Sequence, residues 1–256
     1  MKKQRIVIFG NNWVAWKLVE WLHSQNENIV GLVVHPDKKA RYRDEIIHAS
    51  GLSEGSVVVA TKDVRKSLAH YVRLWRPDIC FSIFYDYILS REFVGVFPYG
   101  IVNVHPSYLP YNRGQYPNVW SIVDGTPSGV TLHYIDEGID TGDVIAQEKV
   151  EIEAVDTGKT LYNKLELGCI DLFKRTWPLI KSGSVRRISQ ENLRGTCHRA
   201  DDVRCIDEID LNKYYKASDL IDLIRARTFS PYSGAYYMKD GKRIYVRMEL
   251  MHEDQL

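Results

Sequence analysis

Short apolar runs alternate with segments of helical periodicity in the first half of the chain. Residues 6–9 form a continuous apolar run that ends at Gly10, and apolar residues then recur at Val14, Leu18 and Leu22. This spacing is typical of a buried strand, a tight turn and an amphipathic helix. The pattern recurs, with further apolar runs at residues 29–34, 57–60, 79–84 and 101–104 and helix-like segments at residues 41–49 and 64–75.

Buried strands that are joined by crossover helices predict a parallel sheet. Residues 129–135 and 144–150 predict two later strands, so the sheet is mixed but mostly parallel. Residues 156–177 gather apolar positions on one side and predict a long helix that Pro178 ends, with Thr157 and Thr160 as caps. The sequence therefore predicts an α/β fold, with a Rossmann-like, mostly parallel sheet and flanking helices.

The pattern weakens from Gly183 to about residue 207, where polar sequence predicts a connecting segment. A helix at residues 217–227 follows, and then a hairpin in which residues 236–238 and 244–246 flank a turn at residues 239–241. We expect two parts, a main domain over residues 1–182 and, over residues 183–256, the connecting segment with a small C-terminal α+β unit.

The predicted hairpin carries an apolar pattern that little nearby sequence can cover. Tyr236 and Met238 alternate on one strand, and Ile244 and Val246 alternate on the other. An uncovered apolar strand face is a common site of association. We therefore expect this hairpin to join two protomers into a homodimer, and the alternative is that the hairpin packs on its own domain.

Composition narrows the class of protein. The 256 residues are 45% hydrophobic and 26% charged, as in ordinary globular proteins. The 34 basic and 33 acidic residues leave a net charge of +1, which gives no overall basic field for nucleic acid. The apolar run at residues 6–9 is too short for a signal peptide or a membrane span. We expect a cytoplasmic protein without a nucleic-acid or membrane partner.

The four cysteines favour the same compartment. They form no C-x-x-C pair and no zinc-ligand spacing, and most have apolar neighbours, as small buried core residues do. The sequence therefore predicts reduced cysteines and no metal site. The cysteines are Cys80, Cys169, Cys197 and Cys205.

The first strand-to-helix turn argues against a dinucleotide site. It holds Gly10 alone, followed by Asn11, Asn12 and the bulky Trp13, whereas close approach to a pyrophosphate requires several small residues. A structural turn is the simpler interpretation. Asn11, at the helix N-terminus, remains a candidate contact for an anionic ligand.

The densest polar cluster follows a predicted buried strand. Asn103 and His105 are two residues apart, so they point to the same side of that strand. Pro106, Pro110 and Gly114 then hold the next loop out of regular structure, which suits a loop that lines a substrate. The alternative is a hydrogen-bonded core histidine beside a turn asparagine.

A second cluster is the acidic, glycine-containing loop at residues 136–143. By itself it is an ordinary turn between strands, and its sequence lacks the spacing and the flanking helices of a calcium-binding EF-hand. The two clusters together are more informative, because they occur in one order with a strand between them. That order is residues 103–110, Arg113-Gly114, Pro117, Trp120, residues 129–133 and residues 140–142.

Taken together, these residues strongly resemble the formyltransferase family that uses 10-formyltetrahydrofolate. The resemblance is densest over residues 101–150, and the strand and helix pattern extends it over most of the first 180 residues. It implies that residues 1–182 are the catalytic formyltransferase domain and that Asn103, His105 and Asp140 are catalytic. It places the folate in two loops, at Phe84, Tyr85, Tyr87, Ile88 and Leu89 and at Asp136 and Ile139, largely through backbone contacts.

The chemistry that the resemblance implies agrees with the residue types. Formyl transfer to an amine passes through a tetrahedral oxyanion, which requires an oriented donor and a group that handles protons. An asparagine amide donates without titrating, a histidine exchanges protons near neutral pH, and a carboxylate orients the imidazole. No metal is needed.

The fold and the donor do not identify the acceptor amine, because one scaffold serves several amines by varying its loops. The chain continues past the catalytic core, and its tail resembles the segment shared by the tRNA and amino-sugar branches of the family. The loop after His105 is similar in particular to the amino-sugar branch, which acts on nucleotide-linked sugars, so we expect such a sugar as acceptor, for a surface glycan such as an O-antigen. The candidate contacts are Asn11, Ser107, Tyr108, Tyr111, Arg113, Tyr116 and Trp120, whose rings and guanidinium suit a sugar, a base and a phosphate.

Two alternatives stay open. Methionyl-tRNA is the other amine that a chain with this tail would formylate, although the charge balance disfavours a large RNA ligand. A folate-binding or regulatory protein without catalysis is the alternative of another class, and a missing catalytic residue would favour it. Asn103, His105 and Asp140 are all present.

Overall fold

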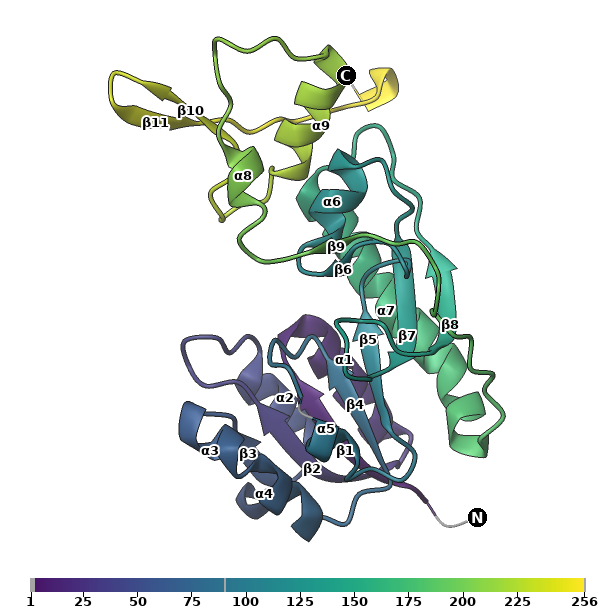
Figure 1. The fold of residues 1–256 in the computed structure, drawn as a ribbon. Helices are drawn as coiled ribbons and strands as arrows, with labels where there is room; N and C mark the ends of the chain where they lie inside the picture. Colours follow the sequence, from purple (N-terminus) through teal and green to yellow (C-terminus); the bar gives the residue numbers. More distant parts are fainter. Residues whose placement is uncertain (1–2, 90, 256) are drawn as a thin grey trace. The chain divides into compact units, whose positions relative to one another are not determined.

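The computed structural model describes residues 3–89 and 91–255. Its largest sheet has the strand order β3-β2-β1-β4-β5-β7-β8 (Figure 1). The strands from β3 to β5 pair in parallel, and β7 is antiparallel to β5. The predicted α/β fold with a mostly parallel sheet is thereby confirmed. The strands of this sheet are β1 (Arg5–Gly10), β2 (Asn28–Val34), β3 (Val57–Val59), β4 (Ile79–Ile83), β5 (Ile101–His105), β7 (Gly129–Tyr134) and β8 (Val144–Lys149).

Helices connect and cover these strands, and two short strand pairs lie outside the large sheet. The helices are α1 (Asn12–Ser24), α2 (Arg43–Ser50), α3 (Lys62–Lys66), α4 (Leu68–Leu74), α5 (Arg91–Val94), α6 (Pro117–Val123), α7 (Gly158–Ser182), α8 (Arg204–Asp207) and α9 (Ala217–Ala226), with 3₁₀ turns at Glu54–Ser56 and Glu253–Gln255. The short strands are β6 (Arg113–Gly114) with β9 (Cys197–His198), and β10 (Tyr236–Lys239) with β11 (Lys242–Tyr245).

The chain divides into two compact units that are interleaved in sequence. The first unit contains Met1–His105, Thr131–Ala146 and Cys169–Glu191. The second unit contains Pro106–Val130, Gln147–Gly168 and Asn192–Leu256. This grouping differs from a single boundary at residue 182, and the division into domains 1–182 and 183–256 stays a prediction.

Both faces of the sheet are covered in the first unit. Phe81 of β4 contacts α7 on one face, with ring centroids 4.8 Å from Phe173 and 5.4 Å from Trp177. On the other face, Phe9 of β1 lies in a cluster with residues of α4 and with Phe93 of α5. Strands that are apolar on both faces need cover on both sides, which explains the unbroken apolar runs in the sequence.

The long helix α7 begins as predicted but does not end at Pro178. Thr157 and Thr160 cap its start reciprocally, because each hydroxyl accepts a hydrogen bond from the backbone N–H of the other residue. The prediction that Pro178 ends the helix was wrong, since α7 continues to Ser182 and tolerates one missing backbone donor. The helix ends at Ser182, and the next residue, Gly183, has a φ of +70°, which L side chains rarely adopt.

Two other predicted details differ from the structure. The helix expected at residues 64–75 is two helices, α3 and α4, which meet at Ser67. None of the four cysteines forms a disulfide; Cys80 and Cys169 are buried as predicted, but Cys197 and Cys205 are exposed.

The hairpin of β10 and β11 forms, with a turn one residue shorter than the one predicted at residues 239–241. Lys239 pairs with Lys242, so the turn has two residues, Asp240 and Gly241, both with positive φ. Tyr236 lies opposite Tyr245 and Tyr237 lies opposite Ile244, so Tyr236 and Met238 lie on one face of the hairpin and Ile244 lies on the other.

Candidate active site

Two neighbouring antiparallel strands bring the central polar residues together. In the β5–β7 pair, Asn103 lies opposite His133 and His105 lies opposite Thr131. Residues two apart on a strand share a face, so these four side chains lie on the same side of the sheet. His105 and His133 are both buried, and their ring centroids are 6.0 Å apart.

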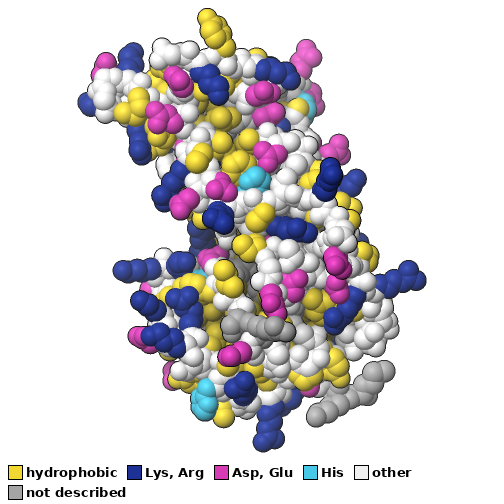
Figure 2. All heavy atoms as spheres, in the orientation of Figure 1, with side chains coloured by type: hydrophobic (Ala, Val, Ile, Leu, Met, Phe, Trp, Pro, Cys, Tyr) yellow, Lys and Arg dark blue, Asp and Glu magenta, His cyan; other side chains and the backbone are white. Residues whose placement is uncertain are grey.

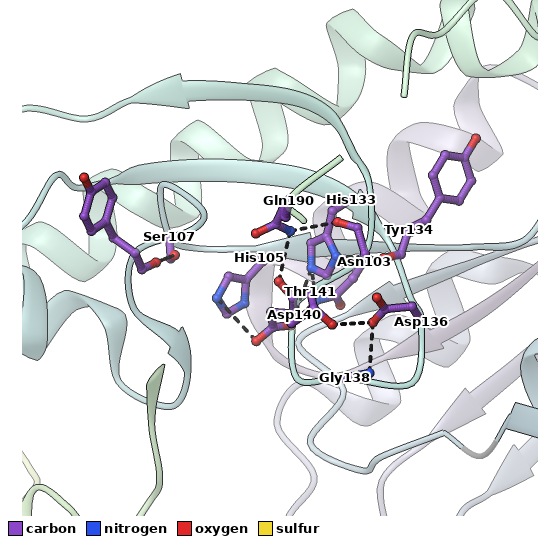
Figure 3. A network of polar contacts seen from close by, with 12 residues as sticks. Asn103, His105, Ser107, His133, Tyr134, Asp136, Gly138, Asp140, Thr141 and Gln190 are labelled. Carbon is purple, nitrogen blue, oxygen red and sulfur yellow. Dashed lines mark hydrogen bonds and ion pairs between the residues drawn. The ribbon is translucent and has the colours of Figure 1, made fainter. Parts of the chain in front are cut away.

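The acidic loop between β7 and β8 places Asp140 beside this cluster. Its Oδ2 lies 3.6 Å from Nε2 of His105, and its Oδ1 lies 3.4 Å from Nε2 of His133 (Figure 3). The Asp140 side chain is mostly buried. The three residues that the resemblance implies to be catalytic therefore converge within the first unit. They are Asn103, His105 and Asp140. A carboxylate at this distance favours the protonated form of His105.

The hydrogen bonds of His133 define which of its nitrogens is protonated. Its Nδ1 lies 2.9 Å from the carbonyl oxygen of Tyr134, so Nδ1 carries the proton and donates it. Nε2 then has a lone pair and accepts from the Asn103 amide at 3.1 Å. The assignment follows from the network of donors and acceptors.

The same network orients the amide of Asn103. Its Nδ2 lies 3.1 Å from Nε2 of His133 and 3.3 Å from Oδ1 of Asp140, and these two acceptor atoms are 3.4 Å apart. The three atoms form a nearly equilateral triangle, so both acceptors lie close to the amide nitrogen of Asn103. An amide oriented by these acceptors suits a donor to a negative charge on a substrate oxygen.

Internal hydrogen bonds give the acidic loop its shape. The Asp136 carboxylate accepts from the backbone N–H of Gly138 at 3.0 Å and from the Thr141 hydroxyl at 2.7 Å. Buried Gln190 donates to the carbonyl oxygens of Asp140 and Gly142 at 3.0 and 2.7 Å. The side chain of Asp136, one of the predicted folate contacts, is thus hydrogen-bonded within the loop itself.

The loop after β4, residues 84–89, is the other predicted folate contact. Tyr85, Tyr87 and Leu89 pack against the core, whereas Ile88 is 89% exposed. Ile139 of the acidic loop is also exposed, at 48%. The two loops of the predicted folate contact thus each expose one isoleucine side chain.

The side chains predicted to contact the acceptor differ in whether their polar atoms are already hydrogen-bonded within the protein. In the first unit, the Asn11 side chain is used within the protein, donating to the carbonyl of Lys39 and accepting from the N–H of Arg41. In the second unit, buried Ser107 donates to the carbonyl of Tyr111. Neither polar side chain is open to a ligand in this conformation.

The side chain of Trp120, a predicted acceptor contact, is almost completely buried. It is 6% exposed, and its ring stacks on His198 with centroids 4.0 Å apart. The neighbouring Tyr116 is exposed at 42%, and Tyr108, Tyr111 and Arg113 are partly exposed. The backbone of Arg113 is held by β9. The partly exposed side chains remain the better candidates for acceptor contacts.

Sequence reasoning missed the roles of His133 and Gln190. The signal for His133 was present, since it alternates with Thr131 on a strand as Asn103 and His105 do. Gln190 lies about fifty residues from its partners in a polar segment, so no local pattern identifies it. Among the described residues there is no cluster of His, Cys, Asp or Glu that could hold a metal ion. No helix in the described part of the chain is long and apolar enough to cross a membrane.

The fold and this cluster define an α/β enzyme that acts on a carbonyl group, with an amide donor, an imidazole and a carboxylate at one end of its sheet. The chain belongs to the formyl transferase family, whose N-terminal domain matches residues 3–168. It is a formyltransferase, and its formyl donor is 10-formyltetrahydrofolate. Residues 202–252 match the N-formyltransferase dimerization C-terminal domain.

Individual relatives point to two acceptors. A 4-N formyltransferase from Francisella tularensis is 25% identical, with a TM-score of 0.82, over 97% of this chain and 98% of that one. The formyltransferase PseJ from Anoxybacillus kamchatkensis, in complex with UDP-4,6-dideoxy-4-formamido-L-AltNAc and tetrahydrofolate, is 30% identical, with a TM-score of 0.57, over 78% of this chain and 88% of that one. A methionyl-tRNA formyltransferase from Acetivibrio thermocellus is 29% identical over 98% of this chain and 81% of its own length.

Proposed function

We propose that the protein transfers the formyl group of 10-formyltetrahydrofolate to the amine of a nucleotide-linked amino sugar. The observation that carries this proposal is the likeness to PseJ, a 30% identical enzyme held with a UDP-linked formamido sugar and tetrahydrofolate. The near-complete coverage of a 4-N formyltransferase, C-terminal part included, supports it. The product would serve a surface glycan such as an O-antigen, made in the cytoplasm.

The three converging residues are assigned complementary roles in this reaction. The acceptor amine attacks the formyl carbon, and the side-chain amide of Asn103 stabilises the charge that develops on the formyl oxygen. His105 accepts the proton that the amine loses and returns it to the departing nitrogen of the donor. Asp140 stabilises His105 while it is protonated. One C–N bond forms, one breaks, and the proton passes between the two nitrogens.

The donor and acceptor are held by different residues in this proposal. The loop at residues 84–89 and the acidic loop around Ile139 contact the folate, with exposed Ile88 and Ile139 against its apolar rings. The exposed or partly exposed side chains of the predicted acceptor set are the proposed contacts of the sugar nucleotide, namely Tyr108, Tyr111, Arg113 and Tyr116. Contacts remote from the amine provide binding energy that positions it for attack.

Methionyl-tRNA is the second candidate acceptor, because a 29% identical relative bears that name. A tRNA is bound chiefly through its phosphates, which requires clustered positive charge. The net charge of the chain is +1, and Figure 2 shows basic and acidic side chains interspersed on the visible face. The charge distribution therefore favours the smaller acceptor.

One experiment separates the two acceptors. The protein and 10-formyltetrahydrofolate are incubated with charged initiator tRNA and, separately, with dTDP-, UDP- and GDP-linked amino sugars, and the new amide is followed by mass. We expect formylation of at least one sugar nucleotide and none of the tRNA. Formylation of the tRNA alone would overturn the proposal. An Asp140→Asn variant serves as the control for uncatalysed transfer.

A further inference from the structure

A buried histidine outside the catalytic cluster contacts three consecutive residues of the loop at residues 84–89. His35 directly follows β2 and is 1% exposed. Its Nε2 accepts a hydrogen bond from the backbone N–H of Asp86 at 3.3 Å. Its ring stacks on Tyr87, with centroids 4.8 Å apart and planes at 14°, and meets the edge of Tyr85 at 4.9 Å. The shape of this loop is thus tied to one imidazole.

The hydrogen bond to Asp86 requires a neutral imidazole. Because Nε2 accepts, it has no proton, and the single proton of the ring is on Nδ1. Among the described residues Nδ1 has no hydrogen-bond partner, and the nearest carboxylate oxygen, Oδ2 of Asp86, is 3.8 Å away. A second proton on the ring would place an N–H of His35 against the N–H of Asp86. The bond would be lost and two donors would face each other.

The surroundings of His35 oppose that second proton. Burial lowers its pKa below the ordinary 6.5, and the charges of Lys39 and Arg65 lower it further, against the opposite effect of Asp86. Both cations lie over the Tyr87 ring, Lys39 Nζ at 4.9 Å and Arg65 at 3.9 Å from its centroid. These groups come from the loop after β2, from α3 and from the loop after β4.

Tyr85, which contacts His35, provides no negative charge that would stabilise a protonated imidazole. Burial raises the pKa of the Tyr85 hydroxyl, which stays uncharged and has no hydrogen-bond partner among the described residues. The carboxylate of Asp86 is about half exposed, so water weakens its attraction for the imidazole. The surroundings of His35 therefore favour its neutral imidazole.

We propose that His35 is a positioning residue that holds the loop at residues 84–89 in the shape that binds the folate donor, and that protonation of His35 releases the loop. This inference rests on the proposed contact between that loop and the donor. Because the imidazole is favoured in its neutral form, the ordered loop is fully stabilised above pH 6.5, the ordinary pKa. That stabilisation is lost as the pH falls below 6.5, and donor affinity falls with it.

Equilibrium binding of 5-formyltetrahydrofolate tests the proposal without the pH dependence of catalysis. Its Kd is measured at about pH 7.5 and about pH 5.5 for the wild type, His35→Gln and His35→Phe. In His35→Gln the Oε1 atom lies as many bonds from Cα as Nε2 does, so it can accept from Asp86 without titrating. In His35→Phe the stacked ring remains but the acceptor is lost.

We expect the wild type to bind about tenfold more weakly at the lower pH, and His35→Phe to bind about tenfold more weakly than the wild type at the higher pH. His35→Gln should bind as the wild type does at the higher pH, with little change between the two. His70→Gln, at an exposed histidine of α4, is the matched control and should follow the wild type.

The outcomes separate the inference from the proposed function. If the wild type fails to bind the folate at either pH, the proposed donor contact and this inference both fail. If the wild type binds equally at both pH values, or if His35→Gln keeps the full pH dependence, only the inference on His35 is overturned. Far-ultraviolet circular dichroism establishes that each variant is folded, and His35→Asn provides a second non-titrating variant if His35→Gln is not.

Discussion

Asp140 is the residue on which the candidate active site depends most. Its two oxygens approach two different histidines, at 3.6 Å for His105 and 3.4 Å for His133, and one of them also accepts from Asn103. The residue adopts a φ of +52°, and Gln190 holds its carbonyl. A single carboxylate thus lies against both His105, the proposed proton-transfer group, and Asn103, the proposed amide donor.

Replacement of Asp140 by asparagine should lower turnover by about two to three orders of magnitude, the range expected when a proton-transfer group loses its support. The volume is kept but the charge that stabilises protonated His105 is removed. His105→Ala and Asn103→Ala should each give losses of similar size. Turnover is measured with the donor and the acceptor identified above, and thermal unfolding checks the fold. Near-normal turnover of Asp140→Asn would remove this carboxylate from the mechanism.

Secondary structure elements differ in how far the sequence determines them. The strands β1, β2 and β4 were predictable because both of their faces are buried, which leaves an unbroken apolar run. The end of α7 was not, because packing along the rest of a long helix outweighs the donor that Pro178 lacks. The hairpin register depends on turn geometry, which local apolar alternation does not report.

The residues of the candidate site also differ in how far the sequence predicts them. Asn103, His105 and Asp140 were found because they occur in a family pattern, and the β5–β7 register then explains their proximity. His35 and Gln190 act through partners about fifty residues away in sequence. Contacts of that range depend on the tertiary fold and leave no spacing that a single sequence reveals.

Gly142 connects the acidic loop to β8, and its lack of a side chain is required. A Cβ at this position would lie 1.9 Å from the carbonyl oxygen of Tyr134. Gly142→Ala should therefore shift the loop that carries Asp140, lower the free energy of unfolding by about 1–3 kcal/mol and lower turnover. Gly55→Ala is the matched control, since a Cβ there would meet no atom within 4 Å. Denaturant unfolding and turnover of both variants test this, and equal effects would contradict it.

At the scale of the whole molecule, the remaining question is association. Residues 202–252 match a dimerization domain. In that region a small core around Ile209, Ile224 and Ala235 leaves apolar side chains of the hairpin exposed. The exposed hairpin residues are Met238, Ile244 and Tyr245. Exposed apolar side chains on a short hairpin are explained if a second copy of the chain covers them.

We predict that the protein is a homodimer through this hairpin. Light scattering across a wide concentration range should give twice the chain mass of 29.6 kDa. Ile244→Lys with Tyr245→Ser should shift the mass toward the monomer, because a charge would enter an apolar interface. Lys239→Ser, at the exposed end of β10, is the control and should leave the dimer intact. A monomeric wild type would defeat the dimer prediction and leave the catalytic one unaffected.

The hydrogen bonds of Gln190 have a consequence for where the polypeptide can be shortened. A truncation after Ser182 would retain Asn103, His105 and Asp140, but it would remove the amide that fastens the acidic loop, together with the pairing of Ile188 with Val144. A truncation after Glu191 would retain both. The minimal fragment with an intact arrangement of these residues therefore extends about nine residues beyond the last turn of α7, although those residues contain no catalytic group.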